Sequence, residues 1–73
     1  MKLAYHFSKF VKEKRQEKKW DKAKLGLLAG VTRATIWNIE KRSLNVTLHT
    51  VESVLKALDC TLQDFYDYIE GNK

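Results

Sequence analysis

The chain has 73 residues, 44% of them hydrophobic, and a formal net charge of +5. This length allows one domain with a modest core, and the apolar content argues against wholesale disorder. No apolar run approaches the ~20 residues of a membrane span, and the N-terminus lacks a signal-peptide pattern. Three Gly and no Pro indicate an all-helical chain, so we expect a single all-α cytoplasmic domain over residues 1–73.

Basic residues are concentrated in the first part of the chain. Residues 1–42 hold 12 Lys and Arg against four Asp and Glu, whereas residues 43–73 hold two against five. A concentrated basic region is typical of proteins that bind polyanions. It is equally compatible with a solvated, lysine-rich helix, so charge alone does not identify a partner.

The first predicted helix runs from about Ala4 to about Lys18. Apolar residues repeat along this segment at helical spacing: Leu3, Phe7, Phe10 and Val11. Trp20 follows it, next to a capping residue, where a hydrophobic staple would pack onto the next helix.

Residues 21–42, DKAKLGLLAGVTRATIWNIEKR, organise the chain. Asp21 is a helix N-cap and Gly30 a helix stop, which predicts a helix over Lys22–Ala29. Thr32 is a second N-cap and predicts a helix over Arg33–Lys41. Two short helices joined by a Gly-containing turn form a helix-turn-helix unit, whose second helix is a candidate reader of the DNA major groove. The positions expected to face inward are Leu25, Leu28, Ala29, Val31, Ile36 and Ile39.

Two further helices are predicted after a linker at residues 43–46. Thr47 caps a helix of about residues 48–58, and a capping box of Thr61 and Asp64 starts a last helix at Leu62 that ends at Gly71. The core positions expected here are Leu48, Val51, Leu55, Leu58, Leu62, Phe65 and Ile69. The one cysteine, Cys60, excludes an intramolecular disulfide, and we expect it to be a small core residue.

A longer pattern of apolar, capping and charged residues extends from about Phe10 to Phe65. Its members are Val11, Arg15, Trp20, Leu25, Gly30, Val31, Thr32, Thr35, Ile36, Ile39, Glu40, Thr47, Leu48, Leu55, Leu58 and Leu62. In this combined spacing the chain resembles the Cro/C1-type (XRE-like) helix-turn-helix family of phage repressors, restriction-modification controllers and antitoxins. The resemblance implies a compact five-helix, lambda-repressor-like domain. Gly26 stands where the family usually has Ala, which weakens the helix but permits close approach of the next one.

The resemblance also implies an ion pair between Arg15 and Glu40. Both residues lie on inward-facing helical stripes, and family members commonly place an Arg and a Glu at these positions. The alternative is two independent surface charges. If the pair is buried, removal of one partner costs ~3–5 kcal/mol, because the other charge is left uncompensated.

Side chains near the start of a recognition helix face the base edges. The candidates for base contact are Arg33, Ala34, Trp37 and Asn38. Arg33 can bind guanine, Asn38 adenine and Ala34 a thymine methyl group, although Arg33 can also serve a phosphate. Trp37 either stacks on sugar or base edges or covers Leu27 and Leu28. The candidates for phosphate contact are Lys22, Thr35, Lys41, Arg42 and Ser43.

A homodimer would present two recognition helices to a palindromic operator. The resemblance places the dimer interface in the loop before the fourth helix and in the C-terminal helices. The apolar and aromatic candidates there are Leu44, Val46, Val54, Tyr66 and Tyr68, each of which has core packing as its alternative.

No catalytic or metal constellation is visible. His6 and His49 lack a ligand spacing, and there is no Gly-rich phosphate loop. We therefore expect no enzyme, no cofactor and no metal. The favoured function is a sequence-specific regulator of transcription, a repressor or autoregulator that binds double-stranded DNA. The alternatives are an antitoxin-like protein that binds a toxin-like partner, and nonspecific nucleic-acid binding by the basic half.

Overall fold

The computed structural model describes residues 3–41 and 46–71. This part of the chain contains five helices and no strand: α1 (Leu3–Glu17), α2 (Lys22–Ala29), α3 (Arg33–Glu40), α4 (Leu48–Ala57) and α5 (Leu62–Gly71). Every predicted helix is present, and its bounds lie within one residue of the predicted ones. No described helix is long and apolar enough to cross a membrane.

Side chains at the predicted caps set the helix starts. Asp21, Thr32 and Thr47 each accept a hydrogen bond of 2.7–3.1 Å from the backbone N–H three residues later. Thr61 and Asp64 satisfy each other's backbone N–H groups, at 3.0 Å and 2.8 Å, in the expected capping box. These bonds pair donors that have no partner inside the helix, so the helix starts follow from local sequence.

The turn between α2 and α3 depends on two glycines. Gly30 has a φ of +72°, a left-handed backbone that other residues rarely adopt, and the next N–H, of Val31, donates to the Gly26 carbonyl at 2.9 Å. A Cβ at Gly26 would lie 3.0 Å from the Val31 carbonyl oxygen and 3.1 Å from that of Thr32. Gly26 therefore allows the backbone that leads into α3 to lie directly against α2.

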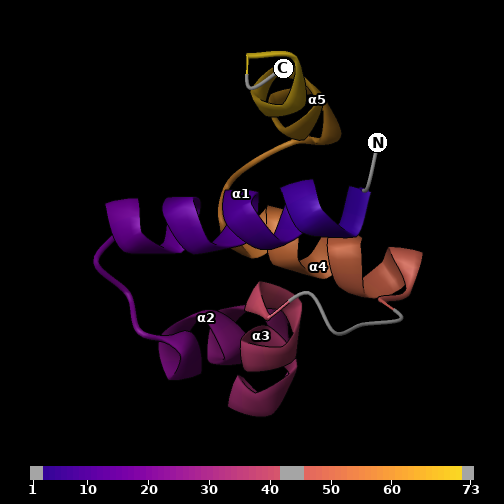
Figure 1. Cartoon of the computed structure of the whole chain (residues 1–73). Helices are drawn as coiled ribbons and strands as arrows, with labels where there is room; N and C mark the ends of the chain where they lie inside the picture. The colour runs from indigo at the N-terminus through magenta and orange to yellow at the C-terminus, as the bar shows by residue number, and fades with distance from the viewer. Residues whose placement is uncertain (1–2, 42–45, 72–73) are drawn as a thin grey trace.

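The core draws on all five helices. In Figure 1, α1 crosses the middle of the molecule, with α2 and α3 on one side and α5 on the other. An aromatic cluster joins α1 to α5, because the Phe65 ring lies 5.4 Å from that of Phe7 and 5.2 Å from that of Phe10. The buried apolar side chains are Phe7, Phe10, Val11, Leu25, Ile36, Ile39, Val54, Leu55, Leu58, Phe65 and Ile69.

Four leucines expected in the core are exposed instead. Leu3, Leu48 and Leu62 are 59%, 87% and 67% exposed. Each is the first residue of its helix, where no neighbouring element covers the side chain. Leu28 is 48% exposed and borders a shallow hollow between α2 and α4.

Val54 was predicted to lie at an exposed dimer interface and is buried instead. The side chain is completely buried within the core, so its assignment to the dimer interface is wrong: a residue enclosed by its own chain has no surface to offer a partner. Trp20, Val31 and Cys60 are half-buried and pack against the core. Burial raises the pKa of the Cys60 thiol.

Candidate nucleic-acid interface

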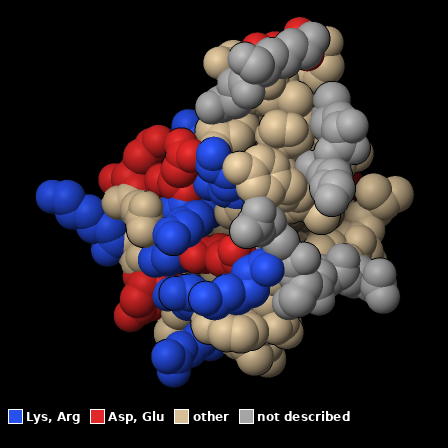
Figure 2. All heavy atoms as spheres, in the orientation of Figure 1, with Lys and Arg blue, Asp and Glu red and all other residues tan. Residues whose placement is uncertain are grey.

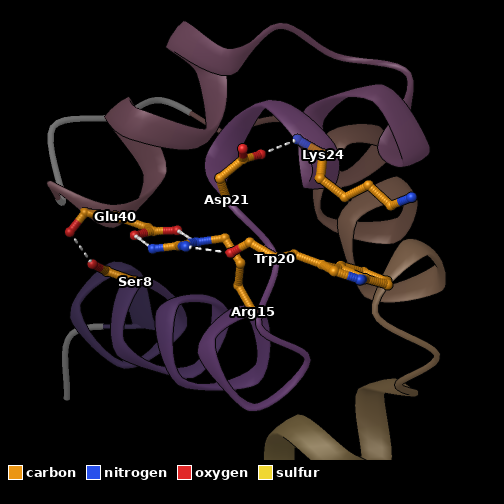
Figure 3. A network of polar contacts seen from close by, with 6 residues as sticks. All are labelled: Ser8, Arg15, Trp20, Asp21, Lys24 and Glu40. Carbon is orange, nitrogen blue, oxygen red and sulfur yellow. Dashed lines mark hydrogen bonds and ion pairs between the residues drawn. The ribbon is translucent and has the colours of Figure 1, made fainter.

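Helix α3, the second helix of the helix-turn-helix unit, is fixed to α1 by a buried ion pair (Figure 3). Arg15 Nε and Nη2 donate to the two carboxylate oxygens of Glu40, at 2.7 Å and 3.0 Å, and Nη1 donates to the Trp20 carbonyl at 2.7 Å. The two charged side chains are only 9% and 5% exposed. The hydrogen bond to Glu40 raises the pKa of Arg15, so the guanidinium stays charged. The Ser8 hydroxyl also donates to the Glu40 carbonyl, at 2.7 Å.

This network fixes the position of α3 relative to α1. Because Arg15 and Ser8 both hold the C-terminal end of α3, the helix is clamped to α1 at that end. Its inward stripe, Ile36 and Ile39, is buried in the core. The opposite stripe is open, because Arg33, Ala34 and Trp37 are exposed. In Figure 1, α3 lies at the edge of the molecule, on the other side of α1 from α5.

The four side chains predicted to contact bases come together on this open stripe. They line one hollow of about 250 Å³ on the surface of α3, formed by Arg33, Ala34, Trp37 and Asn38. Arg33 and Ala34 are exposed, Trp37 is 48% exposed and Asn38 is half-buried. Arg33 forms neither a hydrogen bond nor an ion pair with any described residue, so its guanidinium is available to a ligand.

Most of the predicted phosphate contacts that the structure describes flank this hollow. Lys22 and Arg33 line a second hollow of about 270 Å³, together with Arg15, Asp21 and Ala23. At the other end of α3, Lys41 Nζ lies 5.4 Å from the centroid of the Trp37 ring. The Thr35 hydroxyl lies 3.0 Å from that of Thr32, within the cap of α3. Arg42 and Ser43 lie outside the described residues.

The charge of the surface fits an anionic ligand. In Figure 2, Lys and Arg side chains gather over the part of the molecule formed by α1, α2 and α3, with some acidic side chains among them. The cations of Lys22 and Lys41 stand at opposite ends of the helix-turn-helix unit. Cations near both ends of α3 can bind backbone phosphates on either side of a groove that the helix enters.

The predicted dimer residues are less uniform. Tyr66 is 56% exposed, whereas Val46 is half-buried against the core. Tyr68 is half-buried against the core of its own chain: its ring centroid is 5.1 Å from that of Phe10, and its hydroxyl donates to Glu13 at 2.6 Å. Burial and this hydrogen bond raise the pKa of Tyr68. Leu44 lies outside the described residues.

An apolar groove between α4 and α5 was not predicted. It has a volume of about 450 Å³, and the exposed Leu48 and Leu62 stand on its border beside Val51 and Leu55. Sequence reasoning placed both leucines in the core because they fit the helical period. The signal that could have identified them is their position, since each directly follows a Thr cap. In the described residues, no cluster of His, Cys, Asp or Glu could hold a metal ion.

The fold and this surface define a helix-turn-helix protein. The family model described as Helix-turn-helix matches residues 11–65, and the chain belongs to this Cro/C1-type family of DNA-binding transcriptional regulators. Among curated proteins, none matches the sequence.

Solved structures of a restriction-modification controller protein, C.Esp1396I, share this fold. A tyrosine-to-alanine variant is 27% identical, with a TM-score of 0.87 over 96% of this chain and 92% of that one. A tyrosine-to-phenylalanine variant is 26% identical, with a TM-score of 0.87 over 97% and 91%. The C.Esp1396I tetramer in complex with its natural 35 base-pair operator is 27% identical, with a TM-score of 0.86 over 96% and 93%.

Proposed function

We propose that the protein is a cytoplasmic, non-enzymatic autoregulator of transcription that binds a palindromic operator as a homodimer through α3. The observation that carries the proposal is the single hollow that gathers Arg33, Ala34, Trp37 and Asn38 on the open stripe of α3. A recognition helix in the major groove needs side chains of this kind on one stripe, because base edges present hydrogen-bonding groups and methyl groups along the groove floor.

Each residue has a distinct role in this proposal. Arg33 donates two hydrogen bonds to guanine O6 and N7, and Asn38 pairs with adenine N6 and N7. Lys22, Thr35 and Lys41 bind phosphates and set the register of the protein on the duplex. The ion pair of Arg15 and Glu40 acts indirectly, because it fixes the angle at which α3 leaves the core.

The proposed homodimer brings two copies of α3 to the same face of the duplex. One recognition helix offers few base contacts, so useful affinity requires a second one about 34 Å away. The groove bordered by Leu48 and Leu62 is a better candidate for the dimer contact than Val54, because its apolar surface is exposed. Its position away from α3 leaves the recognition helix free. The similar controller protein is a tetramer on its operator, which supports assembly of more than one copy.

Fluorescence anisotropy tests the proposal directly. The protein is titrated into duplex DNA from upstream of its own gene and into a scrambled duplex, at two salt concentrations. We expect a preference of ~10³-fold or more for the upstream duplex. Equal binding that disappears with salt would contradict the proposal and favour a partner protein or nonspecific binding.

A charge-matched pair of variants separates base reading from general attraction. Arg33→Ala and Lys9→Ala each remove one positive charge, but Lys9 lies over the Tyr5 ring on α1, outside both hollows of α3. We expect Arg33→Ala to lose ~1–3 kcal/mol of discrimination between the two duplexes and Lys9→Ala to lose none. Lys22→Ala should weaken binding to both duplexes and reduce the salt slope by ~1.

A further inference from the structure

Recognition of base edges by hydrogen bonds does not explain why a tryptophan, Trp37, stands on the exposed stripe of α3. Its indole N–H is a single donor, and 48% of the residue is exposed. Nor does Trp37 serve to cover the side chains of Leu27 and Leu28. Leu27 is 77% exposed, and Leu28 borders a different hollow, shared with Ser53 and Ala57 of α4.

Trp37 lines an apolar hollow on the surface of α3. Trp37 and Ala34 line it together with Arg33 and Asn38, and the surface of the hollow is almost entirely apolar. Arg33 precedes Trp37 by one helical turn, and Lys41 follows it by one turn, so the three lie along the same stripe of α3. The cation of Lys41 lies 5.4 Å from the ring centroid, a cation–π contact that helps to hold the indole in place.

Only one kind of group in the major groove fits such a hollow. The base edges there present nitrogen and oxygen donors and acceptors, and the one prominent apolar group among them is a C5-methyl. Thymine carries this methyl group, and so does cytosine after methylation at C5. Since Arg33 and Asn38 border the hollow, a methyl group seated in it would lie beside base edges that these side chains can reach.

We propose that Trp37 and Ala34 form a binding site for the C5-methyl group of a pyrimidine, which makes Trp37 a specificity-determining residue. The proposal rests on the proposed function, because α3 must lie in the major groove. It adds a property that hydrogen-bonding recognition does not have: affinity depends on a methyl group alone. If the pyrimidine is a cytosine, methylation of the DNA regulates binding.

The test begins with the preferred duplex, selected by the full-length protein from a random-sequence pool. Each thymine of that duplex is then replaced in turn by uracil, which removes the methyl group and leaves every hydrogen-bonding group unchanged. We expect one position in each half-site at which the replacement weakens binding about fourfold, and about fifteenfold when both half-sites are changed, from the methyl group's apolar burial. At that position, cytosine and 5-methylcytosine are compared next. A gain with 5-methylcytosine extends the site to methylated cytosine, and no gain assigns it to thymine.

Two variants locate the effect. Trp37→Ala should bind the thymine and uracil duplexes equally. Leu27→Ala removes another exposed apolar side chain of the helix-turn-helix unit, outside the hollow, and should keep the wild-type ratio. Circular dichroism checks that both variants are folded.

Three results would overturn the inference, and they differ in what they say about function. A preferred duplex that is insensitive to uracil at every position refutes the methyl site and leaves the proposed function intact, and this arm needs no variant. An unchanged ratio in folded Trp37→Ala places the methyl contact elsewhere. If the selection yields no preferred sequence, the proposed function itself fails.

Discussion

Removal of Glu40 should be among the most damaging single changes outside the apolar core. Glu40→Ala leaves the Arg15 guanidinium, with a side chain only 9% exposed, without the carboxylate that accepts two of its hydrogen bonds. A buried charge that loses its partner costs ~3–5 kcal/mol. A domain of this size has a total unfolding free energy of about 4–11 kcal/mol at typical values per residue, so the loss is a large share of the total stability.

The assay is urea denaturation followed by far-ultraviolet circular dichroism, and the chain supplies its own control. Lys14 and Glu17 form a second ion pair at 3.6 Å, but their side chains are 33% and 63% exposed. Glu17→Ala should therefore change the unfolding free energy by less than ~1 kcal/mol. Glu40→Gln keeps a hydrogen-bond acceptor for Arg15 and should fall between the two alanine variants.

A double replacement separates the buried charge from general damage to the fold. Arg15→Met combined with Glu40→Leu leaves no unpaired charge and retains similar volume, so it should cost less than Glu40→Ala alone. The reasoning is refuted if Glu40→Ala and Glu17→Ala have equal effects, or if the double variant is as unstable as Glu40→Ala.

Three further predictions concern stability and reactivity. Gly26→Ala should destabilise the protein by ~1–3 kcal/mol, because the new Cβ would meet backbone carbonyls of the turn at 3.0–3.1 Å. Gly71→Ala is the control, since a Cβ there has open space and should change the stability little. A Gly26→Ala variant that is more stable than the wild-type protein in urea denaturation would contradict this prediction. The folded state holds the phenolic proton of Tyr68 more tightly than the unfolded state, since its pKa is raised. The contribution of Tyr68 to the unfolding free energy is complete below pH ~10 and is lost as the pH rises towards the folded pKa. Tyr68→Phe should therefore show a smaller fall in unfolding free energy at alkaline pH than the wild-type protein. If the two curves of unfolding free energy against pH run parallel, the contact with Glu13 is contradicted. Burial also raises the pKa of the Cys60 thiol. A thiol reagent at mildly alkaline pH should therefore label Cys60 more slowly than free cysteine, and urea should restore the rate of free cysteine. Equal labelling rates without urea would show that the thiol is not buried.

Much of the fold follows from local sequence. The caps at Asp21, Thr32 and Thr47 and the stop at Gly30 act within one helical turn, which is why the sequence predicts the starts of α2, α3 and α4 and the end of α2 to within one residue. The candidate base contacts followed from the start of α3, because four residues at consecutive and one-turn spacings share a stripe whatever the rest of the chain does.

Exposure could not be predicted in the same way. Helical periodicity identifies which side chains share a stripe but not which neighbour covers them, and coverage depends on how long the adjacent helices are and at what angle they cross. Leu48 and Leu62 fit the helical period, but their side chains are exposed. Val54 was a candidate for the dimer interface, but its side chain is buried. The same limit left the role of Trp37 open, since its surroundings depend on where Leu27 and Leu28 point.

Five helices, their approximate ends and a basic helix-turn-helix unit follow from the amino-acid sequence alone, because caps, glycines and charges act over a few residues. The family resemblance named Arg15 and Glu40 as partners, but only the tertiary structure showed that their charges are buried and clamp α3 to α1. Tertiary structure also decided that Trp37 lines an open hollow and that two leucines border a groove between α4 and α5. These features arise where residues far apart in the chain meet, and the relative placement of whole helices is set by packing rather than by any local signal.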